Sequence, residues 1–254
     1  MTMKLSIFLR KAVKALTPYG ILVLYQRIKE QRALRKLYGL KSYCPICEKE
    51  SYFRPFGVKP RQKAQCLHCG SLERHRLLWL FFKKQEKLFE NENKILHIAA
   101  EPYFETRFKK TFGKNYLTAD LNNPNAMVKM DITDIHYPDE SFDIVICNHV
   151  LEHVPDDRKA MHEFYRVIKK NGWAILNVPM KNVDKTYEDF SITTKEDREK
   201  AFGQWDHVRI YGRDYVDRLK LAGFNVSVIK REDIASVNEI NRMNLDKEII
   251  FCKK

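Results

Sequence analysis

The most specific chemical pattern in the sequence is a set of four cysteines arranged as two Cys-x-x-Cys pairs. Each pair turns two thiolates toward one point, and two such turns complete a tetrahedral metal site. Because four sulfurs fill the coordination of zinc, we expect a structural Zn²⁺ rather than a catalytic one. Four free thiols are the alternative. The pairs are Cys44 with Cys47 and Cys66 with Cys69, separated by 18 residues.

The sequence pattern of residues 142–178 predicts the secondary-structure elements that position a second set of polar, potentially catalytic side chains. The apolar run at residues 142–147 is typical of a strand buried on both faces. Residues 156–168 have the periodicity of an amphipathic helix, which we expect Asn171-Gly172 to end through a left-handed turn. Residues 173–178 read as the next strand. A strand, helix and strand with short links form a right-handed crossover in a parallel sheet.

Polar side chains follow the first of these strands, at the edge where such sheets bind ligands. They are Asn148, His149, Glu152 and His153. Histidine suits general-base work near neutral pH, so His149 and His153 are candidate catalytic residues. His207 is a third candidate, because its segment is expected to close over the site. Glu152 is expected to orient a histidine.

Two carboxylates end neighbouring predicted strands. Residues 94–100, 115–120 and 126–132 read as three strands, and Asp120 and Asp131 stand near the ends of the last two. An acid at the first of these positions can accept two hydrogen bonds from a ribose diol. An acid at the second can accept one from an adenine amino group. This spacing predicts a nucleoside site, and residues 225–231 and 248–252 are expected to add an antiparallel pair of strands.

Positive charge is concentrated in the N-terminal third of the chain. The formal net charge is +13, and residues 1–94 hold 21 Lys and Arg against 7 Asp and Glu. Residues 3–16 and 21–38 read as helices that either pack on the domain or anchor it to anionic lipid. The chain has no apolar run of about 20 residues, the length that crosses a membrane. We expect a cytoplasmic protein, with peripheral contact to the inner face of the membrane through residues 1–38.

Three regions are predicted from these patterns. Residues 1–40 form the basic helices, residues 41–92 the four-cysteine module with a connecting helix, and residues 93–254 the main domain, with a lid around residues 181–206. Ser71 is expected to cap the connecting helix, and residues 73–76 are candidates for lining a substrate entrance.

Residues 94–254 resemble the class I S-adenosylmethionine-dependent methyltransferases, in particular the type 11-like group with a LEHV segment. The resemblance rests on KILHIAAEP, YLTAD, KMDITDIHYPDESFDIVICNHVLEHV, YRVIKKNGWAILNVP and DHVRIYGRDYVDRLKLAGF. It implies an α/β fold with a Rossmann-like seven-stranded sheet of order 3-2-1-4-5-7-6, the last strand antiparallel, alongside the N-terminal helices and a small zinc-ribbon-like module. The cysteine pairs followed by CGSLERHRLLWL look like those of a bacterial subset with such a module.

The resemblance also implies which residues bind S-adenosylmethionine (SAM). Asp120 would bind the ribose, Asp131 and Ile132 would frame the adenine, and Asn148 would pass near the methionine end. The full set of expected cofactor contacts is His97, Ala99, Ala100, Glu101, Asp120, Leu121, Asp131, Ile132, Asn148 and His149.

The first loop departs from the family pattern. These enzymes carry glycines there, which let the backbone approach the ligand, whereas this chain has Ala99, Ala100 and Glu101. The two alanines are small enough for a modified approach. Glu101 is expected to accept a hydrogen bond from the methionine ammonium group. Loss of cofactor binding is the opposing interpretation.

Three functions compete. The first is a methyltransferase that acts by in-line displacement on an oxygen or nitrogen of a small molecule, a glycan or a lipid-linked saccharide. The second is an RNA methyltransferase, with Tyr52, Phe53 and Phe56 stacking on bases; the absence of an Asn-Pro-Pro-Tyr-type clamp counts against it. The third is a non-catalytic scaffold that binds a partner through its basic third. The acceptor and the oligomeric state are left open by the sequence.

Overall fold

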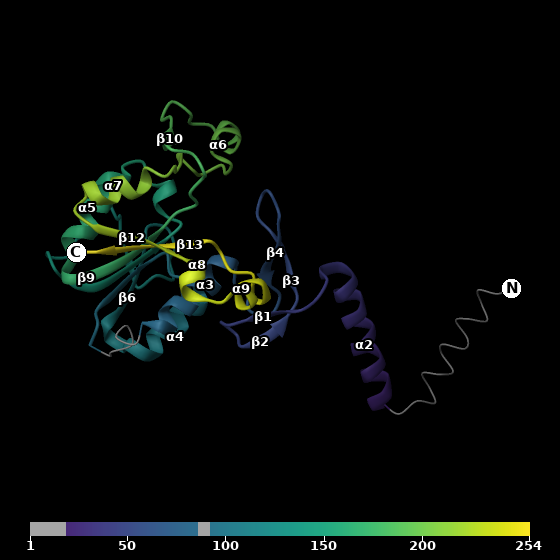
Figure 1. The fold of residues 1–254 in the computed structure, drawn as a ribbon. Helices are drawn as coiled ribbons and strands as arrows, with labels where there is room; N and C mark the ends of the chain where they lie inside the picture. Colours follow the sequence, from purple (N-terminus) through teal and green to yellow (C-terminus); the bar gives the residue numbers. More distant parts are fainter. Residues whose placement is uncertain (1–18, 86–91) are drawn as a thin grey trace.

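The computed structural model describes residues 19–85 and 92–254, and its centre is a seven-stranded sheet (Figure 1). The strand order is β12-β13-β9-β8-β5-β6-β7, in which β13 is antiparallel to both neighbours and the other pairs are parallel. This confirms the predicted order 3-2-1-4-5-7-6. The strands are β5 (Ile95–Ile98), β6 (Tyr116–Asp120), β7 (Val128–Lys129), β8 (Phe142–Asn148), β9 (Ile168–Asn177), β12 (Asn225–Lys230) and β13 (Glu248–Lys253).

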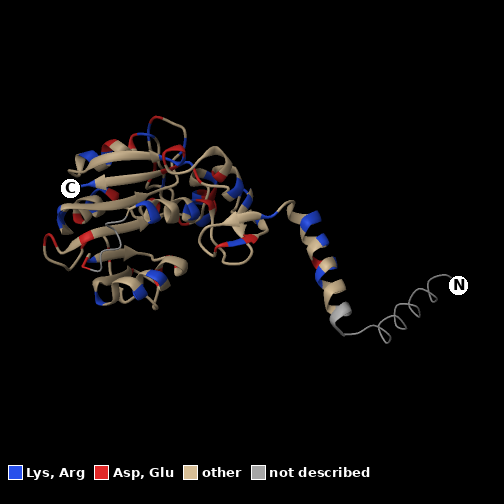
Figure 2. Ribbon diagram, turned by 60° about the horizontal axis from the view of Figure 1, so that its bottom comes forward, with Lys and Arg blue, Asp and Glu red and all other residues tan. Residues whose placement is uncertain are grey.

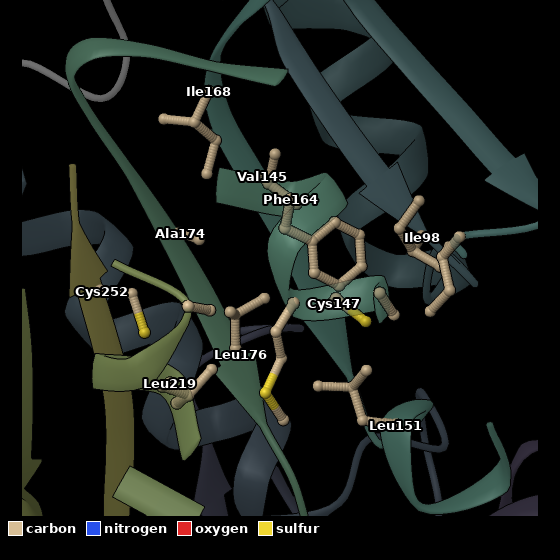
Figure 3. Packing of buried hydrophobic residues seen from close by; sticks show 14 of the residues in the cluster. Ile98, Val145, Cys147, Leu151, Phe164, Ile168, Ala174, Leu176, Leu219 and Cys252 are labelled. Carbon is tan, nitrogen blue, oxygen red and sulfur yellow. The ribbon is translucent and has the colours of Figure 1, made fainter. Parts of the chain in front are cut away.

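Alternation along β8 assigns its side chains to two cores. Val145 and Cys147 belong to a core with α5 (Asp157–Val167) and α7 (Tyr215–Leu221), where Phe164 lies among the strand residues (Figure 3). Successive side chains of a strand point to opposite faces, so Ile144 and Ile146 face the other way. Both faces are therefore covered, and truncating a core ring such as Phe164 to Ala is expected to cost about 3–5 kcal/mol.

The second core joins the sheet to the cysteine module. It contains Ile144 and Ile146 together with side chains from α3 (Glu73–Lys84), α4 (Pro102–Phe112), α8 (Arg231–Ile234) and α9 (Val237–Met243). Cys44, Phe53 and Cys66 of the module belong to the same core. The module is thus packed on the sheet domain through continuous apolar contacts.

The module consists of two short antiparallel ribbons, and one buried arginine ties it to the C-terminal helices. The ribbons pair β1 (Ser42–Cys44) with β2 (Lys49–Ser51) and β3 (Phe53–Phe56) with β4 (Arg61–Cys66). Arg76 is fully buried and donates to the carbonyls of Ala64 and Ser71 in the module and of Met243 and Asn244 at the C-terminal end of α9. Its guanidinium also lies 4.2 Å from the centre of the Phe53 ring. Arg76 is therefore a structural residue, not part of an entrance.

The predicted helix cap at Ser71 is wrong. The helix α3 begins two residues later, with Leu72 as N-cap, and the Leu72 N–H donates to Nδ1 of His75 at 3.1 Å. The Ser71 hydroxyl instead lies 3.3 Å from Sγ of Cys44 and 3.2 Å from Sγ of Cys69. The sulfur cluster, not the helix end, fixes this side chain.

The predicted end of the helix at Asn171-Gly172 is also wrong. Helix α5 ends at Val167, and Ile168 is already extended and pairs with Phe142 of β8. Ile168 is fully buried, so the gain from packing it in the strand outweighs continuation of the helix. Asn171 does adopt a left-handed φ of 65°, but within β9. A Cβ at Gly172 would lie 2.7 Å from the Asp143 carbonyl oxygen, so glycine is needed for the close approach of the strands.

Other boundaries shift by a few residues. The third strand is only Val128–Lys129, shorter than the predicted 126–132. The predicted helix at 21–38 is present as α2 (Tyr19–Tyr38), whereas the one predicted at 3–16 lies outside the described residues.

Helix α2 extends away from the sheet domain, with its basic residues spread along it (Figures 1 and 2). Leu24, Tyr25, Ile28 and Leu37 are exposed on it. Among the described residues, this helix contacts the module where the Tyr52 hydroxyl donates to the Gln31 carbonyl. Whether it packs further on the domain stays a prediction. Across residues 19–85 and 92–254, none of the helices has both the length and the apolar character of a membrane span.

The segment expected to act as a lid has a firmly held base. It contains α6 (Lys195–Phe202) between β10 (Tyr187–Glu188) and β11 (Arg209–Ile210), which pair with each other. Arg209 is buried, forms an ion pair with Glu188 at 2.9 Å and donates to the Leu151 carbonyl at 2.9 Å. Because leaving such a charge unpaired in the interior is costly, the base of the segment is fixed beside β8.

Candidate functional site

The parallel strands end together at one edge of the sheet, and the predicted cofactor residues follow these ends. Glu101 comes after β5, Asp120 ends β6 and Asn148 ends β8. The neighbouring strand β9 ends with Asn177, which pairs in register with Asn148. The predicted site residues are therefore brought to a single edge.

The loop after β5 keeps a left-handed turn without a glycine. Ala99 has φ of 48°, and its N–H donates to the Ala119 carbonyl at 2.9 Å. A residue with a Cβ is strained there by about 1–2 kcal/mol, and the small methyl group limits steric conflict. The chain then turns at Glu101, which precedes Pro102, the first residue of α4. Ala99 and Ala100 are both partly exposed along this turn.

Glu101 is the centre of a polar network beneath the edge. Its Oε2 accepts from Nε2 of His97 at 2.9 Å, and its Oε1 accepts from Nδ2 of Asn148 at 3.2 Å. The Asn148 Oδ1 in turn accepts from Nδ2 of Asn177 at 2.9 Å, and Nδ1 of His97 lies 2.8 Å from the Tyr116 hydroxyl. The network spans β6, β5, β8 and β9, so it fixes the direction of the carboxylate.

This environment keeps Glu101 negatively charged. Burial alone would raise its pKa, but the hydrogen bond from His97, followed by the electrostatic effects of His97 and His75, lowers the pKa to about 2. His97 is fully buried. It therefore acts on any ligand through Glu101, and a direct contact of the kind predicted for it is not available in this arrangement.

His75 is brought to the same network from α3, outside the sheet domain proper. Its Nδ1 accepts from the Leu72 N–H, so the proton is on Nε2, which has no hydrogen-bond partner among the described residues and lies 3.8 Å from Oε1 of Glu101. Burial lowers the pKa of His75 to about 3 and keeps the ring neutral. Of the four residues proposed to line an entrance, His75 is the one beside the predicted site.

Among the described residues, Asp120 is held by its own loop through one of its two oxygens. Its Oδ1 accepts from the backbone N–H groups of Asn122 and Asn123 at 2.7 and 2.8 Å. The side chain is partly exposed, as a ligand contact requires. Oδ1 thus orients the carboxylate and the second oxygen is the one left for a diol.

A cavity of about 470 Å³ lies beside Asp120. Leu121 and Asp131 line it from the loops after β6 and β7, as the predicted adenine site requires, and His136 and Tyr137 complete the wall. The Asp131 Oδ1 accepts from the backbone and the hydroxyl of Thr133, which lowers its pKa. Ile132 is almost fully buried, so its side chain belongs to the sheet core.

The three candidate catalytic histidines converge on one buried carboxylate. His149 has φ of 56°, and its Nδ1 lies 3.5 Å from Oε1 of Glu152. His153, at the end of a single 3₁₀ turn (Leu151–His153), forms an edge-to-face contact with His207 at 4.7 Å between ring centres. Burial lowers the pKa of His207 and favours its neutral form. The expected approach of His207 to the histidines that follow β8 is therefore consistent with the geometry.

The four cysteine sulfurs are also brought together, with each sulfur within 4.8 Å of the others. Burial, followed by the negative charges of Cys44 and Cys66, raises the pKa of Cys47 to about 11. A divalent cation reverses this effect because it favours the thiolates. The donor set of four sulfurs in tetrahedral reach suits Zn²⁺. His68, inside the second pair, is exposed and contacts Lys49.

Asn177 is the residue that the sequence analysis missed. Besides Asn148, it holds the Ile250 N–H through its Oδ1 at 2.8 Å, and so connects the site to β13. The sequence did carry a signal for Asn177. It is an amide near the end of an otherwise apolar strand, next to the strand that ends in Asn148.

Part of the chain matches a known protein family. Residues 85–176 match the family model described as a methyltransferase domain, which spans β5 to β9. None of the curated proteins gives a significant match. The family match, with the sheet order described above, supports a SAM-dependent methyltransferase of class I.

Two solved structures illustrate the similarity. The YcgJ protein from Bacillus subtilis is 18% identical with a TM-score of 0.46, over 71% of this chain and 95% of that one. A SAM-dependent methyltransferase from Archaeoglobus fulgidus is 17% identical with a TM-score of 0.46, over 70% of this chain and 93% of that one.

Proposed function

We propose that this chain, whose residues 85–176 match a methyltransferase domain, transfers the methyl group of SAM to an oxygen or nitrogen of a small molecule or saccharide. The cofactor supplies an activated methyl group, so the protein mainly aligns the acceptor with the methyl–sulfur bond. The chain's own residues hold the cofactor and prepare the acceptor.

The observation that carries the proposal is the charged carboxylate of Glu101 at the carboxyl edge of the sheet. It is held by His97 and Asn148 and its pKa is lowered to about 2, so it is an anion at neutral pH. An anion fixed there complements the ammonium of the methionine part of SAM. This accounts for a loop without glycines, because a side-chain oxygen takes over the accepting role of a backbone carbonyl.

The other contacts of the cofactor follow from the same edge. The free oxygen of Asp120 is assigned to the ribose diol, and the cavity between Leu121 and Asp131 to the adenine. Charged groups already oriented by the protein bind without a large entropic cost. The hydrogen bonds that hold Glu101, Asp120 and Asp131 from behind supply this orientation.

The acceptor is assigned to the side of the site formed by the histidines. His149 and His153 follow β8, and His207 comes directly after the predicted lid (residues 181–206), just before β11. A neutral imidazole can accept the proton that an oxygen or nitrogen nucleophile loses. The segment around α6 is proposed as the lid that closes over a small acceptor.

We also propose that the four-cysteine site binds a structural Zn²⁺. Cys44, Cys47, Cys66 and Cys69 would fill its coordination, which leaves no open position for a reactant. Packing of the module against α3, which carries His75 to the Glu101 network, connects this metal to the integrity of the cofactor site.

The RNA alternative has weaker support in the structure. Of the three aromatic residues considered for base stacking, Tyr52 and Phe53 are buried, at 7% and 1% exposure, and Phe56 is exposed. Stacking on bases needs accessible ring faces.

Calorimetric titration of the purified chain with SAM tests the proposal. We expect one binding site with a micromolar dissociation constant in wild type. The activity itself is sought by incubating the chain with SAM and a panel of activated sugars and metabolites, and by mass spectrometry for products that gain one methyl group. Absence of SAM binding at millimolar concentration would refute the proposal in favour of a non-catalytic scaffold.

A further inference from the structure

We infer that Glu152, His153 and His207 form a binding site for a divalent first-row transition-metal cation, distinct from the four-cysteine site. Each of the three residues offers one ligand atom, and these atoms lie within 4.8 Å of one another. Two imidazoles and one carboxylate are a donor set that such cations bind, with positions left open for other ligands.

The strongest sign of a missing ligand is the orphaned oxygen of Glu152. The residue is 2% exposed, and its Oε2 is buried without a hydrogen-bond partner among the described residues. Leaving such an acceptor unsatisfied costs about 1–3 kcal/mol, and more for a charged group. The other oxygen, Oε1, lies 3.5 Å from Nδ1 of His149. A cation beside Oε2 would satisfy it and would neutralise the buried charge.

His153 is oriented in the way that metal-binding histidines usually are. Its Nδ1 lies 3.2 Å from the carbonyl oxygen and 3.3 Å from the carboxylate Oδ2 of Asp206. This places the proton on Nδ1 and leaves the lone pair of Nε2 for a ligand. A second hydrogen bond that fixes the tautomer is the recurrent support of a ligating imidazole.

The protein holds the two ligand-bearing segments together before any ligand arrives. The Val208 N–H donates to the Glu152 carbonyl at 2.9 Å, one residue from His207. Arg209 is buried beside it and donates to the carbonyls of Leu151 and Pro155 at 2.9 and 2.7 Å. These bonds join the 3₁₀ turn to the base of the lid segment, so residues more than 50 positions apart in sequence are fixed within reach of one ion.

Only small side-chain movements are needed to form the site. Ligand atoms around one ion, at bond lengths of about 2.0–2.2 Å, lie about 3–3.5 Å apart, somewhat closer than the 4.8 Å limit observed. His153 and His207 are partly exposed, so their rings can move and an acceptor can reach the ion. On the proposed function, the ion would bind an acceptor oxygen and favour its deprotonation. His149 would then be the base, because His153 and His207 would be ligands of the ion. This role rests on the methyltransferase proposal, whereas the site itself does not.

Binding of Mn²⁺ to the zinc-loaded chain, without SAM or acceptor, tests the site. Mn²⁺ prefers carboxylate and imidazole ligands over thiolates, so it leaves the four-cysteine site occupied. The signal of free Mn²⁺ in electron paramagnetic resonance should decrease to a stoichiometry of one bound ion per chain. We expect His153→Gln, His207→Gln and Glu152→Gln each to weaken binding at least 10-fold.

His162→Gln is the matched control, because His162 is exposed on α5, away from the cluster in the contacts described. If Glu152→Gln fails to fold, the two histidine variants still test the site, provided that their circular dichroism spectra match that of wild type. Two results would overturn the inference: no bound Mn²⁺ at millimolar concentration, or binding that persists in both His153→Gln and His207→Gln. SAM titration of the same samples separates these results from the methyltransferase proposal, which does not depend on Mn²⁺ binding.

Discussion

Nε2 of His97 lies 2.9 Å from Oε2 of Glu101, four residues further along the chain, and the pair forms a hydrogen-bonded unit at the end of β5. The histidine comes from inside the sheet, where it is fully buried. The carboxylate stands at the edge, where it also contacts Asn148. A loop without the glycines of the family pattern thus carries an oriented anion instead.

Replacing Glu101 with Gln should weaken SAM binding at least 10-fold with little loss of folded protein. Glutamine keeps the shape and can still accept from His97, but it removes the charge that would meet the ammonium group. Calorimetric titration measures the effect. Glu105→Gln, which removes a surface ion pair with Lys109, is the control and should bind as wild type does. Equal affinity in Glu101→Gln and wild type would exclude the ammonium contact.

Acid sensitivity should reflect the same network. The folded pKa of Glu101 is lowered to about 2 from an ordinary value of 4.5, so its contribution to stability is present above pH 4.5 and is lost as the pH falls toward 2. The pKa of His75 is lowered to about 3 from 6.5, so the unfolded chain takes up its proton first and stability declines from pH 6.5 downward. Thermal melting between pH 7 and 3 should therefore show Tm falling throughout, with the difference between wild type and Glu101→Gln shrinking below pH 4.5.

Ala99→Gly should preserve SAM binding and raise the melting temperature slightly. Glycine adopts a φ of 48° without the strain of a Cβ, a gain of about 1 kcal/mol or about 2–4 °C in a chain of this size. Ala99→Val should do the opposite, because a branched side chain is poorly tolerated at positive φ. Differential scanning calorimetry of the two variants provides the comparison; a stabilised valine variant would contradict the left-handed turn.

The Asp120→Asn variant separates the two roles of the Asp120 carboxylate, which are to hold its own loop and to bind the ribose diol. Asparagine can still accept from the N–H groups of Asn122 and Asn123 through Oδ1, but it loses the second acceptor oxygen. SAM affinity should fall by about 1–3 kcal/mol, while Tm stays near the wild-type value. Asp120→Ala should lower both quantities. If Asp120→Asn binds SAM normally, the ribose assignment is incorrect.

Metal analysis of chain purified without added zinc should find one Zn²⁺ per chain. Cys66→Ser should lose the metal and at least about 2 kcal/mol of stability, since loss of a metal ligand belongs to the mutations with large effects. Because the module packs through α3 against the Glu101 network, this variant should also bind SAM less tightly. Cys252→Ala is the control, since this buried cysteine lies in the core of the opposite face and should leave the zinc content at one.

Removal of residues 1–39 should abolish sedimentation of the chain with anionic liposomes. Helix α2 exposes Leu24, Ile28 and Leu37 among basic residues, and apolar insertion combined with attraction to anionic headgroups is what peripheral binding requires. Full-length chain should pellet with vesicles containing phosphatidylserine and less with neutral ones. Pelleting that survives the truncation would place the contact elsewhere.

The order of the sheet was predicted through the resemblance to class I methyltransferases. The sequence alone was enough to predict the four-cysteine cluster and the positions of Asp120 and Asn148 at strand ends. These predictions succeed because they depend on local spacing: a strand followed by a crossover helix has one favoured hand, and a Cys-x-x-Cys turn brings its own two sulfurs together. They need no knowledge of distant contacts.

Tertiary structure decided what depends on burial and on distant partners. The helix expected to continue to Asn171 ends at Val167 because Ile168 is buried beside Phe142, and Ser71 turns to the sulfur cluster and not to the helix end. The burial of Glu152 with one oxygen unpartnered among the described residues and the meeting of His153 with His207 likewise depend on residues many positions away. Desolvation and hydrogen bonding act through space, so no local pattern in the chain encodes them.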